Sequence, residues 1–202
     1  LERIAAVMQG VNSNYETDLF KNLITASENV LGKAGDVSHK VIADHIRSTS
    51  FLISDGVIPE NEGRGYVLRR ILRRGIRHGY KLGAKKPFLN KLVSDLVAAM
   101  KSGYPQLEKD EEKITSTILK EETKFFETLE KGLDILEEAI TKISNKTIPG
   151  EIVFKLHDTY GFPYDLTNDI AREKKLVIDK DGFDKSMAQQ KASSKEASKF
   201  GQ

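Results

Sequence analysis

The architecture expected for this chain follows from residues 63–77, GRGYVLRRILRRGIR, which separate into two faces at helical spacing. At about 100° per residue, apolar residues and glycines fall on one half of the wheel: Val67, Leu68, Ile71, Leu72, Gly75, Ile76 and, just beyond, Gly79. Five arginines fall on the other half: Arg69, Arg70, Arg73, Arg74 and Arg77. This segment therefore predicts an amphipathic helix with one face in a core.

Positive charge is concentrated in and around this helix and is not spread along the chain. Residues 63–94 contain ten Lys and Arg and no Asp or Glu, whereas the whole chain has a formal net charge of only +2. Solvated helix faces normally mix both signs, and the planar guanidinium fork of arginine matches phosphate oxygens. We therefore interpret the basic face as a surface for a nucleic acid rather than for solvent alone.

Helical periodicity continues on both sides, which predicts an all-α, multi-helix domain with one long amphipathic helix and little or no sheet. We expect Ser38 to cap the helix that ends at Gly56. Residues 151–160 favour a helix, although EIVF could also form a strand. The other expected elements are helices at 1–9, 17–31, 87–103, 107–143, 164–175 and 181–200, and a brief extended segment at 176–179.

The long helix has apolar residues at heptad spacing, with Leu119, Phe126, Leu133 and Ile140 on one line and Leu129, Leu136 and Ile143 on the next. Between residues 107 and 138 there are eleven acidic and five basic residues. We favour packing of this helix within its own domain, and therefore a monomer. The alternative function is a helical protein–protein interaction scaffold that uses this helix as its surface.

Composition excludes several classes of protein. With 202 residues, 39% of them hydrophobic and 31% charged, the chain fits a soluble protein, and it has no apolar run near the ~20 residues that a membrane span needs. There is no cysteine and no segment resembling a signal peptide, which suits the cytoplasm. The pairs Asp44–His45 and His157–Asp158 are only a weak indication of a metal hydrolase, so we expect neither a metal site nor catalytic residues.

Two long strings, ADHIRSTSFLISDGVIPENEGRGYVLRRILRRGIRHGYKLG (43–83) and PGEIVFKLHDTYGFPYDLTNDIARE (149–173), closely resemble alanyl-tRNA synthetases. LERIAAVMQG (1–10) is similar to the tail of class II motif 3, which implies that Arg3 contacts ATP. The resemblance implies a helical tRNA-recognition domain over residues 11–202, with possible subdivisions near 104–106 and 146–150. We expect a piece of a longer protein whose motifs 1 and 2 precede Leu1 and whose zinc-containing editing region follows Gln202.

The parent reaction implied by this resemblance is the attachment of alanine to tRNA with ATP and Mg²⁺, whereas this piece has no cofactor and binds the tRNA acceptor stem. The resemblance makes Asn61 and Asp158 the readers of a G·U pair in the minor groove. From the residues alone, Asn61 could instead cap the basic helix, and Asp158 could accept from backbone amides near Gly161. The candidate phosphate contacts are Arg64, Arg69, Arg70, Arg73, Arg74 and Arg77, although Arg69 and Arg74 could instead pair with the acidic long helix.

Overall fold

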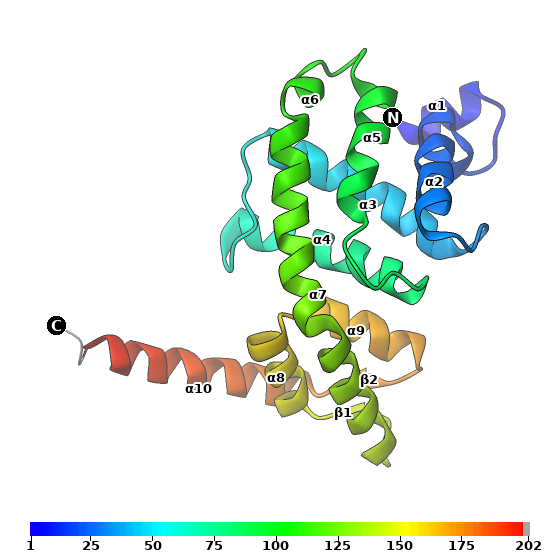
Figure 1. Cartoon of the computed structure of the whole chain (residues 1–202). Coiled ribbons are helices and arrows are strands. Elements are labelled where there is room, and N and C mark those ends of the chain that lie inside the picture. The colour runs from blue at the N-terminus through cyan, green and yellow to red at the C-terminus, as the bar shows by residue number, and fades with distance from the viewer. Residues whose placement is uncertain (200–202) are drawn as a thin grey trace. The chain divides into compact units, whose positions relative to one another are not determined.

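Helices make up nearly all the regular structure of residues 1–199, the part of the backbone that the computed structural model describes (Figure 1). Side chains are described through residue 192. The predicted all-α fold with one long helix is confirmed, and within residues 1–199 the strands are limited to two short segments. No helix among the described residues combines the length and apolar character needed to cross a membrane.

The chain divides into two units, Leu1–Phe126 and the residues from Glu127 onward. The boundary falls inside the long helix α7 (Glu111–Lys142), away from the subdivisions expected near 104–106 and 146–150.

In the first unit α3 is the central helix, and α4, α2, α5 and α6 pack against it (Figure 1). Its elements are α1 (Glu2–Met8), η1 (Asn14–Glu16), α2 (Asp18–Leu31), α3 (Val37–Ser54), α4 (Gly63–Lys81), η2 (Leu89–Leu92), α5 (Val93–Met100), α6 (Gln106–Lys109) and the first part of α7. Leu68, Leu72 and Ile76 are fully buried, which confirms this part of the predicted core face of α4, whereas Ile71 is half-buried. Val67 is 41% exposed, so it lies outside that core.

Three expected helix boundaries were wrong. Asp36, not Ser38, caps α3, because the Asp36 carboxylate accepts the Ser38 N–H at 2.8 Å. The helix expected from Pro87 starts later, as η2, because the backbone N–H groups of Phe88 and Leu89 bond to the Glu122 carboxylate at 2.9 and 2.8 Å. The long helix is interrupted at Asp110, which separates α6 from α7.

The second unit contains the end of α7, β1 (Thr147–Ile148), α8 (Gly150–Tyr160), α9 (Tyr164–Glu173), β2 (Val177–Ile178) and α10 (Lys180–Lys199). The strands are parallel, with Thr147 opposite Val177 and Ile148 opposite Ile178. The predicted helix at 151–160 and the extended segment near 177 are confirmed. β1 was not predicted, because its partner strand lies beyond two helices in the sequence.

In the second unit, the turn between α8 and α9 packs closely against α7. Gly161 ends α8 in the left-handed conformation (φ 70°), and the ring of Phe162 is fully buried. A Cβ on Gly132 of α7 would lie 2.4 Å from Phe162 Cε2, so only glycine allows this packing. The hydroxyl of Thr128 also donates to the Tyr160 carbonyl at 2.9 Å.

Burial along α7 agrees with packing inside the chain. Ile114, Ile118 and Phe125 are fully buried in the first unit, and Leu129 and Leu136 in the second. The other heptad line is less buried: Leu119 is exposed, and Phe126, Leu133 and Ile140 are half-buried.

Candidate nucleic-acid interface

The turn before α4 carries Asn61, the predicted base reader of the first unit. Asn61 is exposed, and Glu62, not Asn61, occupies the N-cap position of α4. Gly65 lets this turn lie against the first turn of the helix, because a Cβ there would be 2.3 Å from the Ile58 carbonyl oxygen. The turn is therefore fixed to α4 by backbone proximity, and Asn61 does not cap the helix.

Arg69 connects three parts of the first unit. Its Nη1 donates to Asn61 Oδ1, and its Nη2 donates to the Pro59 carbonyl at 3.2 Å. Its Nε lies 3.0 Å from Glu121 Oε1 in α7, as an ion pair rather than an aligned hydrogen bond. Of the two arginines for which pairing with the acidic long helix was considered, Arg69 does pair with it.

Arg73 is buried and binds the same carboxylate. Its Nε and Nη2 donate to Glu121 Oε1 at 2.8 and 2.5 Å, and its guanidinium lies 4.9 Å from the centroid of the Phe125 ring. Burial lowers the pKa of Arg73, and the charge and hydrogen bonds of Glu121 oppose that shift. Glu121 thus supplies one negative charge that two largely buried guanidinium groups share.

The remaining arginines differ in exposure. Arg64, in the first turn of α4, is exposed, and Arg70 and Arg74 are half-buried. Arg77 is 7% exposed, as is Arg73. Arg74 contacts α3, with its Nη1 3.3 Å from His45 Nε2. A contact with phosphate requires an accessible guanidinium, so the arginines of this face are not equivalent candidates.

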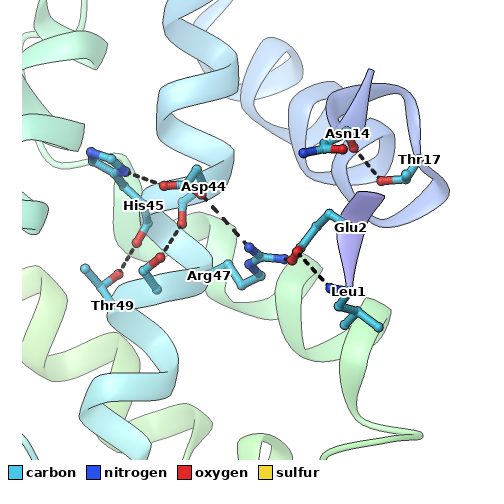
Figure 2. Close-up of polar contacts among 9 residues, drawn as sticks. Leu1, Glu2, Asn14, Thr17, Asp44, His45, Arg47 and Thr49 are labelled. Atoms are coloured by element: carbon cyan, nitrogen blue, oxygen red, sulfur yellow. Dashed lines mark hydrogen bonds and ion pairs between the residues drawn. The ribbon is translucent and has the colours of Figure 1, made fainter. Parts of the chain in front are cut away.

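A chain of polar contacts continues from His45 toward α1. Figure 2 shows Asp44 between His45 and Arg47, with Asp44 Oδ2 3.0 Å from His45 Nδ1 and Arg47 Nη1 2.5 Å from Glu2 Oε1. The hydrogen bond from His45, followed by the charges of His45, Arg47 and Arg74, lowers the pKa of Asp44. This network fixes α1 to α3, and Arg3, the predicted ATP contact, is exposed on α1.

Asp158, the second predicted reader, belongs to the second unit. It is exposed in the last turn of α8, and its Oδ1 accepts from Gln190 Nε2 of α10 at 2.5 Å. The neighbouring His157 ring lies edge-on to Phe183, 5.8 Å between centroids. Within the described part of the chain, no three His, Asp or Glu side chains gather as metal ligands would.

The sequence did not predict the polar contacts made by three residues: Glu121, Glu122 and Gln190. The signal for Glu122 was present, because it stands four residues after Ile118 and three before Phe125, in line with the buried face of α7. An acidic residue in such a line is rarely buried unless it has partners. Nothing near Gln190 in the sequence indicates its contact with Asp158.

One family model and several curated proteins match this chain along nearly its whole length. A family model described as tRNA synthetases class II (A) matches residues 1–202. The chain is 58% identical over 205 residues to the alanine–tRNA ligase of Burkholderia mallei (strain NCTC 10229), and equally similar to those of Burkholderia pseudomallei (strain 668) and Burkholderia thailandensis (strain E264). Each match covers 99% of this chain and 24% of the relative, so the chain spans about a quarter of the length of these curated relatives.

Proposed function

Because this chain belongs to the class II (A) tRNA synthetases, we propose that it is the part of an alanine–tRNA ligase that recognises the acceptor stem of tRNA. The observation that carries the proposal is the similarity to alanine–tRNA ligases along nearly the whole chain. The parent reaction would be the ATP-dependent attachment of alanine to tRNA. Arg3 would contact ATP, whereas Mg²⁺-assisted activation and zinc-dependent editing would belong to other parts of that protein.

The proposed readout follows from the chemistry of RNA. Double-stranded RNA displays its base edges in a wide, shallow minor groove, where a G·U pair offers the guanine 2-amino group as donor and the uracil 2-oxygen as acceptor. An ionised carboxylate only accepts hydrogen bonds, so Asp158 suits the guanine amino group. The amide of Asn61 directs its oxygen to Arg69, so its NH₂ group suits the uracil oxygen.

Phosphate contacts would supply affinity without reading sequence. The accessibility of Arg64, and the partial exposure of Arg70 and Arg74, support these three for that role. The burial of Arg73 and Arg77 supports a role inside the fold, and salt titration of their variants distinguishes the two roles. The chain would act as a monomer, because the most buried apolar line of α7 packs within the chain.

The test is a fluorescence titration of the chain with two RNA hairpins that differ only in a G·U or a G·C pair at the recognised position of the stem. We expect tighter binding to the G·U hairpin, and affinity for both hairpins that falls as salt rises. Equal affinity for the two would refute base reading while leaving stem binding intact. Concentration-dependent dimerisation without RNA affinity would instead support the scaffold function.

A further inference from the structure

Asn61 lies in the turn before α4, and its side chain has a defined partner in that helix. Arg69, two turns into α4, donates to the Asn61 side-chain oxygen and to the Pro59 carbonyl of the same turn. One guanidinium therefore binds both a backbone and a side-chain group of residues 59–61. Because a guanidinium donates and never accepts, the contact also fixes which end of the Asn61 amide faces α4.

Arg69 also forms an ion pair with Glu121 of α7. Its side chain is 14% exposed and that of Glu121 is 7% exposed, with 3.0 Å between Arg69 Nε and Glu121 Oε1. Glu121 is in turn anchored by Arg73, which is packed on Phe125. The planar fork of an arginine can bind several acceptors in one plane, whereas the ammonium group of a lysine acts as a point charge.

We propose that Arg69 is a positioning residue for base recognition: supported by Glu121, it holds Asn61 so that the amide NH₂ group faces outward as a donor. This inference rests on the proposed role of Asn61. A side chain fixed before binding avoids the loss of rotamer freedom when RNA arrives, and the fixed amide direction favours an acceptor such as the uracil 2-oxygen. Arg69 would thus determine specificity without touching the base.

The first test needs no RNA. In a ¹⁵N-labelled sample of the chain, the side-chain NH₂ resonances of Asn61 are identified by their loss in Asn61→Ala. We expect the wild-type resonances to lie away from random-coil positions, and to move toward those positions in Arg69→Lys while the circular dichroism spectrum is retained. Glu121→Gln should produce a smaller shift in the same direction. Unchanged Asn61 resonances in a folded Arg69→Lys variant would overturn the positioning role, whatever the function of Asn61.

The second test measures the ratio of Kd for the G·C hairpin to Kd for the G·U hairpin. We expect Arg69→Lys to lower this ratio about fivefold or more, the scale of coupling between side chains in direct contact, and to have no further effect when combined with Asn61→Ala. Arg70→Lys, the same change one residue along α4, is the matched control, because it should weaken both hairpins alike and preserve the ratio.

The outcomes separate this inference from the function on which it rests. If Asn61→Ala removes the G·U preference but Arg69→Lys preserves it, the positioning role is overturned and the proposed function stands. If Asn61→Ala preserves the preference, the reading role of Asn61 fails and the inference fails with it. If Arg69→Ala weakens both hairpins equally and reduces the salt dependence, Arg69 is a phosphate contact instead.

Discussion

Replacing Arg73 with Ala should destabilise the fold and leave the salt dependence of RNA binding unchanged. The change removes two hydrogen bonds to Glu121 Oε1, at 2.8 and 2.5 Å, and the guanidinium that packs on Phe125. Breaking a buried ion pair by removing one partner costs about 3–5 kcal/mol. Arg69 remains 3.0 Å from the same oxygen, so we expect the lower part of that range, about 3–4 kcal/mol.

Urea unfolding followed by circular dichroism measures the first part of this prediction. A domain of this size should also melt roughly 5–15 °C lower. Arg73→Met is the matched variant, because it retains the apolar contact with Phe125 and loses only the charge; it should be nearly as destabilised if the ion pair dominates. Wild-type stability in both variants would show that Glu121 does not depend on Arg73.

The salt titration supplies the second part. Arg64→Ala removes an exposed cation and should reduce the slope of log K against log salt by about 0.7–0.9, the value for one lost phosphate contact. Arg73→Ala, measured where the variant is folded, should leave the slope at its wild-type value. A slope reduced by about one unit in Arg73→Ala, with stability unchanged, would refute the reasoning and make Arg73 a phosphate contact.

Three further predictions follow from single contacts. Asp158→Asn should remove part of the G·U preference, at a cost of about 1–3 kcal/mol, with unchanged helicity; hairpin titration and circular dichroism measure the two effects. Glu122→Gln should cost about 2–4 kcal/mol in urea unfolding, because one amide oxygen cannot satisfy the three backbone N–H groups of residues 88–90 that the carboxylate accepts. Because the folded-state pKa of Asp44 is lowered, its stabilisation is complete above the unfolded-state pKa of about 3.9 and is lost as the pH falls through the folded-state pKa. The unfolding free energies of the wild type and Asp44→Asn should therefore differ at neutral pH and converge in acid.

The buried face of α4 was predictable because it depends only on the spacing of apolar residues within the helix. Leu68, Leu72 and Ile76 recur at intervals of four residues, and a helix places such residues on one side whatever surrounds it. The cap of α3 was less predictable, because Asp36 and Ser38 are both good capping residues and stand two positions apart. The two residues differ in that the Ser38 side chain has another partner: its Oγ lies 3.1 Å from His78 Nδ1. This contact joins residues 40 positions apart in the sequence.

The environment of the arginines on α4 could not be predicted from helical spacing. The helical period correctly assigned Arg69 and Arg73 to the polar half of α4, but it could not tell a polar half that faces solvent from one that faces a carboxylate. That carboxylate is Glu121, 48 positions beyond Arg73 in the sequence. The roles proposed for Asn61 and Asp158 came from resemblance alone, and neither periodicity nor charge would have suggested them.

The carboxylate shared by Arg69 and Arg73 also constrains how this sequence can evolve. A neutral residue at position 121 would remove the carboxylate that both guanidinium groups bind, where burial weakens the screening of their repulsion, so we expect a lineage that lost Glu121 to change position 69 or 73 as well. A change at position 69 would in turn remove the hydrogen bond to Asn61. Natural variation at positions 69, 73 and 121 should therefore be correlated, with viable sequences differing at several of these positions together and seldom at one alone.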